Sequence, residues 1–404
     1  MTSSRFRPLV ELCDLAIDSI DPRRAPEQEF WYVDITAVDN ATKCITAPQR
    51  VKGKQSSVRA RQVMRSRDVL VATTRPNLNA VALVPDLYNG EVCSTGFCLL
   101  RCSRQLDPDY LFCFVQSQAF IEPLTNLTKG ALYPAVTDRQ VLERVVPWVP
   151  VEEQCQIASH LKAQLAEAER ARMAAEAQLQ DAHALDTALY REAFMQIVPV
   201  AVPPVFGFPP SGWRWRKLAD IAQLESGHTP SRSRPDWWGG NVSWVSLTEI
   251  RELDGTWVER TRLRTNEAGI ANSSARMLPR GTVCFSRTAS VGFVTILDSP
   301  MATSQDFANW VCGDELDPEY LMYALIRSRA ELRAIATGAT HKTIYMPALE
   351  SFHVCAPDRP EQERIISALK KELKDVEQVR IALEQQLCDF KQLPNRLLAE
   401  VFGN

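Results

Sequence analysis

The chain has 404 residues, more than a single hydrophobic core usually holds, so we expect two or more domains. Hydrophobic residues make up 45% of the sequence, charged residues 24%, and the net charge is -3, which excludes a generally basic nucleic-acid-binding chain but not a local basic patch. The eleven cysteines are scattered without a Cys-x-x-Cys pair, no signal-like apolar stretch begins the chain, and no run of 18 apolar residues occurs. These features predict reduced thiols, a cytoplasmic location and no membrane segment.

Residues 1–150 alternate short strand-like runs with polar loops, which predicts a first globular domain. The runs 30–35, 68–72 and 80–84 are rich in residues that favour strands and are bounded by Pro, Asn or Arg. Asp107-Pro108-Asp109 predicts the start of a helix, because it offers a capping side chain, a proline at the first helical position and an acid in the first turn.

Cations gather between residues 50 and 67, where no acid occurs: Arg50, Lys52, Lys54, Arg59, Arg61, Arg65 and Arg67. A polar loop follows and contains Thr74, Arg75 and Asn77. Arg, Lys and Asn are side chains that contact phosphates and pair with base edges in the major groove. We therefore predict that both segments bind DNA, together with Lys129 and Tyr133 on either side of Gly130-Ala131-Leu132. Solvated surface loops are the alternative.

Residues 151–196 predict a long helix with one apolar seam. Its seam residues follow a 4-3 spacing: Leu161, Leu165, Ala168, Arg172, Ala175, Leu179, Ala182, Asp186, Leu189 and Ala193. Such a spacing held for about 30 residues is typical of a helix packed against another helix. Residues 197–212 contain five prolines and predict a linker without folded elements.

The sequence pattern of the first half begins again at Trp213. The clearest matches pair Leu12–Ala16 with Leu218–Ala222, Tyr32–Thr36 with Trp244–Thr248, Val69–Ala72 with Val283–Ser286, Leu106–Leu111 with Leu316–Leu321, and Gly130-Ala131 with Gly338-Ala339. Residues 213–359 therefore predict a second globular domain similar to the first.

Residues 360–404 predict a second seam helix, each of whose seam residues lies 208 positions after its counterpart, as Leu369 does after Leu161. Its seam reads Leu369, Leu373, Val376, Arg380, Leu383, Leu387, Phe390, Pro394, Leu397 and Val401. Parallel pairing would set Arg172 against Arg380, whereas antiparallel pairing sets small residues against large ones and brings Asp186 near Arg380. We predict an antiparallel coiled coil, and expect Pro394 to kink the second helix or to end its regular part early.

The second half repeats the polar loops. We predict DNA contacts from His228, Thr229, Ser231 and Arg232, from Arg287, Thr288 and Ser290, and from Thr340, His341 and Lys342. No phosphate loop, Gly-x-Gly-x-x-Gly turn or metal-ligand spacing of His, Cys and carboxylates occurs, so we predict no catalytic and no metal-binding residues. Asp317-Pro318-Glu319-Tyr320 superficially resembles a methyltransferase motif, but helix capping explains it in both copies.

These residues together resemble a known family, the DNA-specificity (S) subunits of type I restriction-modification enzymes. The resemblance rests on a series of segments in order: 215–221, Ser226–Ser231, Trp237–Val245, Gly281–Arg287, Gly338–Ile344, and Pro360-Glu361-Gln362 before the second helix. The first half departs from this series, since no Thr-Pro-Ser loop or Trp-Gly-Gly turn follows Asp14.

The resemblance implies an α+β fold in which two similar α/β target-recognition domains are separated by two long helices, as a pseudo-twofold internal repeat. It implies a non-catalytic subunit, each of whose domains reads one half of a bipartite asymmetric DNA site. The coiled coil would set the half-site spacing and dock two methyltransferase subunits, and restriction/translocase subunits would join them. This chain would hold no cofactor, while the partner subunits would use S-adenosylmethionine, ATP and Mg2+. The alternatives are a DNA methyltransferase or nuclease with its own catalytic site, and a coiled-coil scaffold for proteins.

Overall fold

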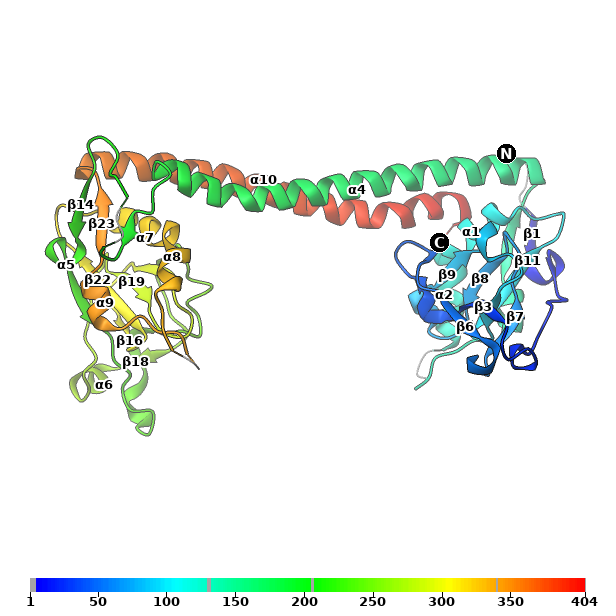
Figure 1. Cartoon of the computed structure of the whole chain (residues 1–404), viewed down its shortest axis with the longest axis horizontal. Helices are drawn as coiled ribbons and strands as arrows, with labels where there is room; N and C mark the ends of the chain where they lie inside the picture. Colours follow the sequence, from blue (N-terminus) through cyan, green and yellow to red (C-terminus); the bar gives the residue numbers. More distant parts are fainter. Residues whose placement is uncertain (1–4, 129–131, 205–206, 339–340, 404) are drawn as a thin grey trace. The chain divides into compact units, whose positions relative to one another are not determined.

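The computed structural model describes residues 5–128, 132–204, 207–338 and 341–403 (Figure 1). The chain forms two compact units. Unit 1 comprises residues 1–177 and 383–404, and unit 2 comprises residues 178–382. Two long helices, α4 (Val151–Ala193) and α10 (Arg359–Phe402), each contribute one segment to each unit.

Among the described residues, the globular part of unit 1 contains four sheets and three α-helices. Its sheets have the strand orders β6-β3-β10-β7, β2-β11-β8-β9, β1-β12 and β4-β5. The strands are β1 (Arg5–Pro8), β2 (Cys13–Asp14), β3 (Glu29–Val33), β4 (Val38–Asp39), β5 (Cys44–Ile45), β6 (Gln49–Lys52), β7 (Ala60–Val63), β8 (Val69–Ala72), β9 (Val81–Leu83), β10 (Val92–Ser94), β11 (Phe97–Cys102) and β12 (Val145–Trp148), and the helices are α1 (Pro108–Gln116), α2 (Gln118–Leu127) and α3 (Asp138–Leu142).

The globular part of unit 2 has three sheets, with the strand orders β15-β22-β19-β20-β17, β18-β16-β21 and β13-β23-β14. The strands are β13 (Val200–Ala201), β14 (Arg214–Lys217), β15 (Ala222–Ser226), β16 (Trp238–Val245), β17 (Trp257–Val258), β18 (Arg264–Thr265), β19 (Val283–Ser286), β20 (Val294–Leu297), β21 (Ala302–Thr303), β22 (Phe307–Cys312) and β23 (His353–Ala356), and the helices are α5 (Leu218–Ile221), α6 (Glu267–Ala271), α7 (Pro318–Arg327), α8 (Arg329–Ala334) and α9 (Met346–Glu350).

Strand pairing repeats between the units in the way the aligned sequence segments predict. The order β2-β11-β8-β9 of unit 1 returns as β15-β22-β19-β20 in unit 2. Tyr32 pairs with Val92 in a parallel ladder, and the matching Trp244 pairs with Ala302, also in parallel. All four residues of both β8 and β19 are buried, because these strands lie inside their sheets and are covered on both faces. The internal repeat is therefore a repeat of structure as well as of sequence.

Helices α1 and α7 begin where the two Asp-Pro pairs predict. The carboxylates of Asp107 and Asp317 accept hydrogen bonds from the N–H groups of Tyr110 and Tyr320, both at 3.0 Å. Each tyrosine hydroxyl is buried and donates to a backbone carbonyl of the strand that precedes a long helix, Tyr110 to Pro147 at 2.7 Å and Tyr320 to Cys355 at 2.8 Å. Capping therefore explains the repeated Asp-Pro motif, as expected.

A buried glutamine joins each long helix to its globular part. Gln154 accepts a hydrogen bond from the Asp107 N–H at 2.8 Å, and Gln362 accepts one from the Asp317 N–H at 2.9 Å. Each side-chain amide donates to two backbone carbonyls, and the glutamines are 0% and 1% exposed.

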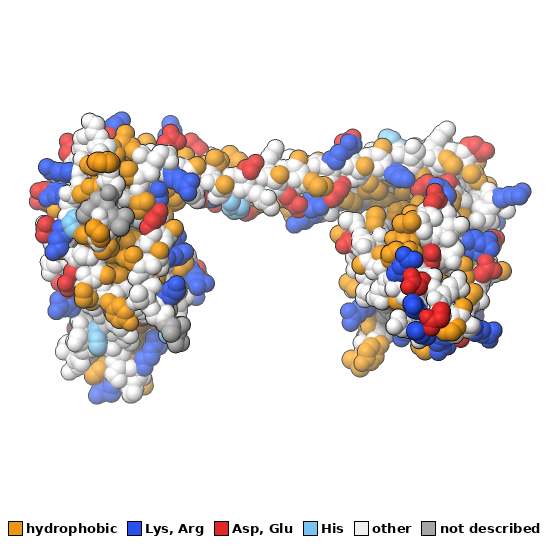
Figure 2. Space-filling model, in the orientation of Figure 1, with side chains coloured by type: hydrophobic (Ala, Val, Ile, Leu, Met, Phe, Trp, Pro, Cys, Tyr) orange, Lys and Arg blue, Asp and Glu red, His pale blue; other side chains and the backbone are white. Residues whose placement is uncertain are grey.

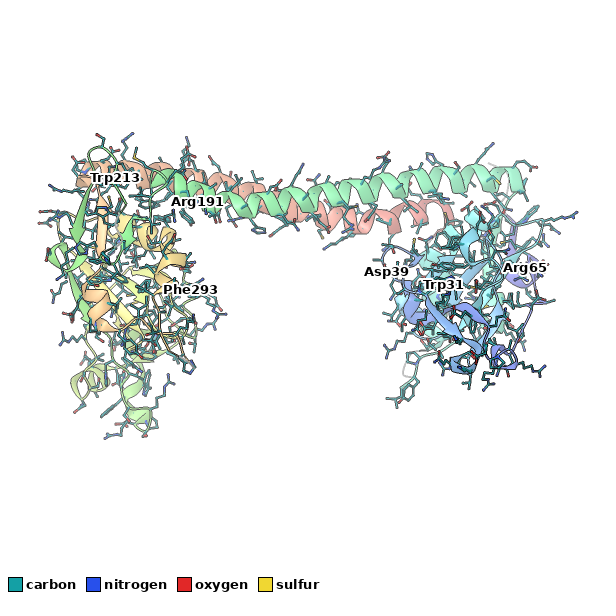
Figure 3. The ribbon with its side chains drawn as sticks, in the orientation of Figure 1. Trp31, Asp39, Arg65, Arg191, Trp213 and Phe293 are labelled. Atoms are coloured by element: carbon teal, nitrogen blue, oxygen red, sulfur yellow. The ribbon has the colours of Figure 1, made fainter. Side chains whose placement is uncertain are left out.

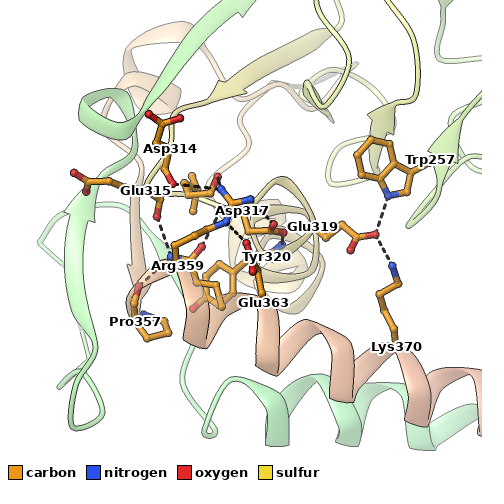
Figure 4. A network of polar contacts seen from close by, with 12 residues as sticks. Trp257, Asp314, Glu315, Asp317, Glu319, Tyr320, Pro357, Arg359, Glu363 and Lys370 are labelled. Atoms are coloured by element: carbon orange, nitrogen blue, oxygen red, sulfur yellow. Dashed lines mark hydrogen bonds and ion pairs between the residues drawn. The ribbon is translucent and has the colours of Figure 1, made fainter.

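Charged contacts also link the start of α7 to α10 in unit 2 (Figure 4). There Arg359 binds Asp317 at 2.9 Å, and Glu319 accepts hydrogen bonds from Lys370 at 2.7 Å and from Trp257 at 2.8 Å.

The long helices α4 and α10 pack antiparallel, as the size contrast along their seams predicts (Figure 1). In unit 2, Arg380 of α10 donates to Asp186 of α4 at 2.7 Å, which is the seam contact expected from the sequence. The small seam residues Ala168, Ala175 and Ala182 are buried.

The structure corrects two expectations for the segments around the helices: an early end of the second helix at Pro394, and a linker without folded elements at 197–212. Helix α10 does not end early at Pro394 but continues to Phe402, because Leu398 and Phe402 are buried in the core of unit 1. The segment 197–212 is not wholly a linker, because Val200 and Ala201 form β13 and pair with β23. Tertiary pairing and packing overrode the local effect of proline in both places.

Candidate nucleic-acid interface

In unit 2, the loop after β19 meets a segment about fifty residues further along the chain. The Ala289 N–H donates to the Lys342 carbonyl at 2.9 Å, the Ile344 N–H donates to the Arg287 carbonyl at 2.9 Å, and Thr288 forms a β-bridge with Thr343. We call the described residues 287–290 and 341–344 loop pair 2. It brings together Arg287, Thr288, Ser290, His341 and Lys342, all of which were predicted from the sequence to bind DNA.

Unit 1 builds the same arrangement after β8. The Arg75 N–H donates to the Pro134 carbonyl at 2.8 Å, the Val136 N–H donates to the Thr73 carbonyl at 2.8 Å, and Thr74 forms a β-bridge with Ala135. We call residues 73–77 and 132–136 loop pair 1. The sequence alignment of the two halves predicts equivalent loops, but only the structure shows that each pair of loops is joined by a bridge.

The two loop pairs present different side chains on this shared backbone. Loop pair 1 exposes Arg75, Asn77 and Tyr133, and the ring of Tyr133 is 87% exposed. Loop pair 2 exposes His341 and Lys342, whereas Arg287 is partly buried and donates to the Gln305 carbonyl at 2.8 Å. The Nε atom of Arg287 is buried and has no hydrogen-bond partner among the described residues. Lys129 and Thr340, which were also predicted to bind DNA, lie outside the described residues.

Six of the seven cations between residues 50 and 67 form ion pairs with acids that lie elsewhere in unit 1. The ion pairs are Arg50–Glu29 at 3.1 Å, Lys52–Glu27 at 3.4 Å, Lys54–Glu27 at 2.9 Å, Arg61–Asp21 at 3.0 Å, Arg65–Asp18 at 2.8 Å and Arg67–Asp109 at 2.9 Å. Arg59 is exposed and has no ion pair within the described part of the chain. Exposed ion pairs of this kind contribute little to stability, about 0 to 1 kcal/mol, so a stronger anion can displace them.

The remaining predicted residues of unit 2 lie on a loop before β16, held by two tryptophans. The indole N–H of Trp244 donates to the His228 carbonyl at 3.1 Å, and that of Trp238 donates to the Ser231 carbonyl at 3.2 Å. The Arg232 guanidinium lies 5.3 Å and 5.8 Å from the centroids of these two rings, and Thr229 bonds Gln305. The loop is thus fixed by backbone contacts while Ser231 and Arg232 stay exposed.

One group of cations of unit 2 was not predicted from the sequence. Arg251, Arg329 and Arg333 surround the ring of Phe293, which is labelled in Figure 3. They come from a loop and from α8, about eighty residues apart, and their only shared sequence signal is the four-residue spacing of Arg329 and Arg333 on one helix.

Within the described ranges, no group of three His, Cys, Asp or Glu side chains could hold a metal ion. No disulfide joins the cysteines, and burial raises the pKa of the Cys13 and Cys93 thiols to about 12, which keeps them protonated. No described helix has both the length and the apolar character needed to cross a membrane.

Residues 210–387 match the type I restriction modification DNA specificity domain family. The chain is 28% identical over 162 residues to the type I restriction enzyme MjaIX specificity subunit of Methanocaldococcus jannaschii, covering 40% of this chain and 38% of that protein. It is 26% identical over 133 residues to the HindI specificity subunit of Haemophilus influenzae, covering 32% and 28% of the two chains. The chain thus matches less than two fifths of the length of either relative.

Two solved structures match over nearly their full length. One, from work on complex assembly and conformational transition of the type I R-M system, has a TM-score of 0.79 and 28% identity and covers 100% of this chain and 98% of that one. The other, the HsdS subunit of Thermoanaerobacter tengcongensis, has a TM-score of 0.76 and 28% identity and covers 100% and 97%. Residues 210–387 thus carry a type I restriction-modification DNA specificity domain, and the chain as a whole, with its two sheet-rich units and antiparallel helices, is similar to the DNA-specificity (HsdS) subunits of type I restriction-modification systems.

Proposed function

We propose that this chain is the non-catalytic subunit that reads DNA sequence for a type I restriction-modification complex, with unit 1 reading one half of a bipartite asymmetric site and unit 2 the other. One observation carries the proposal: loop pairs 1 and 2 share a bridged backbone but carry different side chains. Two domains that recognise different base sequences need the same loop backbone with different side chains.

The side chains of the two loop pairs suit this task. Arginine binds guanine at its O6 and N7 atoms, and asparagine pairs with adenine, so Arg287 and Asn77 can each discriminate bases in the major groove. Each such contact is worth about 1 to 3 kcal/mol against a wrong base. When both half-sites must be bound together, the free-energy costs of wrong bases in the two halves add, so the discrimination against wrong sites multiplies.

The helices α4 and α10 set the distance between the two half-sites of the DNA. They also dock two methyltransferase subunits, and restriction/translocase subunits join this complex. S-adenosylmethionine, ATP and Mg2+ act in those partners, and this chain holds none of them. The antiparallel packing of two helices of 43 and 44 residues supports the spacer role, because helices of this length are about 65 Å long. The matched structure from work on type I complex assembly supports the partner role.

The test is co-expression of the chain with the methyltransferase encoded beside it, followed by sequencing of methylated bases in the host DNA. We expect one bipartite motif with two unlike halves and a fixed spacer. A methyltransferase that is active with another specificity subunit but leaves the DNA unmethylated with this chain would contradict the proposal.

Two other functions give different outcomes. If the chain were itself a methyltransferase or nuclease, the purified chain alone would modify or cut DNA when given S-adenosylmethionine or Mg2+. If it were only a protein scaffold, charge reversal at Arg59 together with Arg287 would leave DNA binding by the assembled complex and its salt dependence unchanged.

A further inference from the structure

Three arginines of unit 2 converge on one aromatic ring. The guanidinium carbons of Arg251, Arg329 and Arg333 lie 5.7, 5.2 and 5.2 Å from the centroid of the Phe293 ring. We call these four residues the Phe293 cluster. Gly292 makes this approach possible, because a Cβ atom at its position would lie 2.9 Å from a side-chain carbon of Arg329 and 3.3 Å from Nε of Arg333.

Positive charge in the Phe293 cluster exceeds negative charge. One guanidinium nitrogen of Arg329 donates to both carboxylate oxygens of Asp254, each at 2.7 Å. Arg333 donates from Nε to the Val291 carbonyl at 2.8 Å, and neither it nor Arg251 has an ion pair in the part of the chain that the structure describes. Burial lowers the pKa of the Arg333 guanidinium, and the neighbouring charges of Arg329 and Arg251 lower it further.

A cavity of about 500 Å3 opens beside the cluster. Arg251, Phe293 and Arg333 line it together with Ser290 and Lys342, and its lining contains no acidic side chain. Ser290 and Lys342 belong to loop pair 2, so the cavity adjoins the surface proposed to read bases. Figure 2 shows blue side chains at the edge of unit 2 where Figure 3 labels Phe293.

We propose that the Phe293 cluster and Lys342 bind one backbone phosphate of the DNA whose bases loop pair 2 reads. The inference rests on the proposed function and adds a residue set to it. Guanidinium groups present paired N–H donors that match phosphate oxygens, and Lys342 adds a point charge. A stacked base is a poorer occupant, because three arginines already cover Phe293. The bound phosphate fixes the position of the DNA duplex along loop pair 2, as phosphate contacts do in other sequence-specific DNA-binding proteins.

The experiment compares Arg251→Gln and Arg333→Gln with the wild-type chain, each assembled with its methyltransferase. Lys217→Gln serves as the control, because Lys217 is exposed on β14 of the same unit and not on α4 or α10, and it lies outside the cavity lining. Binding to the mapped site is measured between 50 and roughly 200 mM salt, a range in which phosphate contacts dominate the change. We expect affinity to fall about tenfold to a hundredfold and the salt slope to fall by about 1 for each cluster variant. The preferred base sequence should not change.

Methylphosphonate substitutions, one phosphate at a time, identify the contact. Wild-type binding should be weakened by one neutral phosphate beside the unit 2 half-site, and Arg333→Gln and Arg251→Gln should be insensitive to that substitution. Arg333→Lys keeps the charge but loses the paired N–H donors of the guanidinium group. It should therefore bind DNA with lower affinity but with the same salt dependence as the wild type.

Three outcomes overturn the inference. The first is the same interference pattern in wild type and cluster variants, and the second is the same loss of affinity in Lys217→Gln. The third is impaired assembly with the methyltransferase and unchanged DNA binding, which would assign the cluster to an acidic partner segment. Failure of the wild-type complex to bind any bipartite site would instead contradict the proposed function itself.

Discussion

At the scale of single residues, the two units hold their arginines differently. The cations of residues 50–67 mostly form exposed ion pairs, whereas Arg287 is partly buried and donates to the Gln305 carbonyl. A guanidinium whose position is set by a backbone contact loses little side-chain entropy when it binds a base. Arg287 is therefore our strongest candidate for direct base recognition.

Replacing Arg287 with alanine should relax specificity at one base pair of the unit 2 half-site. We expect a loss of about 1 to 3 kcal/mol in discrimination there, and no recovery in Arg287→Lys, because a lysine cannot form the two-pronged contact. Competitive binding to a set of sites, each changed at one position, measures this. Equal weakening at every site, including changes in the other half, would show that Arg287 contacts only phosphate.

Lys43 should be a reactive amine. Its Nζ donates to the Asn79 carbonyl at 2.7 Å, and burial lowers the pKa of Lys43 from 10.5 to about 8. Labelling with an amine reagent at pH 8, followed by mass spectrometry, should modify Lys43 faster per accessible area than exposed Lys371.

The same shift makes stability depend on pH. Between about pH 8 and 10.5 the unfolded chain holds the proton that Lys43 of the folded chain has lost, so Lys43 contributes a rise of the free energy of unfolding with pH. The buried thiols of Cys13 and Cys93 contribute a fall above about pH 9, because their pKa values are raised from 9.0. Lys43→Met should remove the contribution of Lys43, so its free energy of unfolding should fall more steeply with pH than that of the wild type, as measured by urea unfolding at several pH values. An unchanged slope would contradict the lowered pKa.

The sequence predicts many of these residues but not their neighbours. Arg287 and Lys342 could be singled out because they lie on repeated polar loops. Arg251 and Arg333 could not, because they meet only when α8 packs beside the turn that contains Gly292, and nothing local marks that contact. The same holds for Asp18, Asp21 and Glu27, whose carboxylates pair with cations from a segment that itself contains no acid.

At the scale of elements, the buried glutamine near the start of each long helix, Gln154 in α4 and Gln362 in α10, acts as a joint. Gln362 is 1% exposed and makes three hydrogen bonds, to the Asp317 N–H and to the Glu315 and Pro357 carbonyls. The sequence does not predict this role, because all three partners come from outside the helix pattern.

Replacing Gln362 with leucine should leave those three backbone groups without partners and destabilise unit 2 by about 3 kcal/mol, since each buried unpaired group costs roughly 1 to 3 kcal/mol and some will recruit water. Gln378→Leu, at an exposed position of the same helix, is the matched control. Urea unfolding gives the free energy, and hydrogen exchange should show faster exchange at the Asp317 amide. Equal effects of both substitutions would mean that the joint contributes nothing.

At the scale of the whole molecule, the order of elements, the repeat and the antiparallel helices were predictable, because periodicity and repetition are visible along the chain. The division into units was not. Each unit takes part of both long helices, since burial of Leu398 and Phe402 ties the end of α10 to unit 1. No local sequence pattern in α10 predicts which globular part its last turns pack against.

Shortening both helices should change the spacing of the DNA site and not its halves. Deleting residues 175–181 and 381–387 removes one heptad from each helix, keeps the Arg380–Asp186 ion pair and shortens each helix by about 10 Å, or about three base pairs. We expect methylation mapping to find the same half-sites with a spacer about three base pairs shorter. The rate should be lower, because three base pairs also rotate the duplex by about a third of a turn. An unchanged spacer would contradict the spacer role.

The placement of Phe402 also determines when the chain can fold during its synthesis. Its ring packs 5.2 Å from that of Tyr110 and 5.5 Å from that of Phe114, inside a core whose other strands and helices belong to the first half of the chain. A ribosome must therefore translate all of unit 2 before unit 1 can complete its core. Unit 2 needs only residues 178–382 and can fold first, so the usual order in which the N-terminal part folds first is reversed. A chain released before residue 383 would contain all of unit 2 and an unfinished core of unit 1.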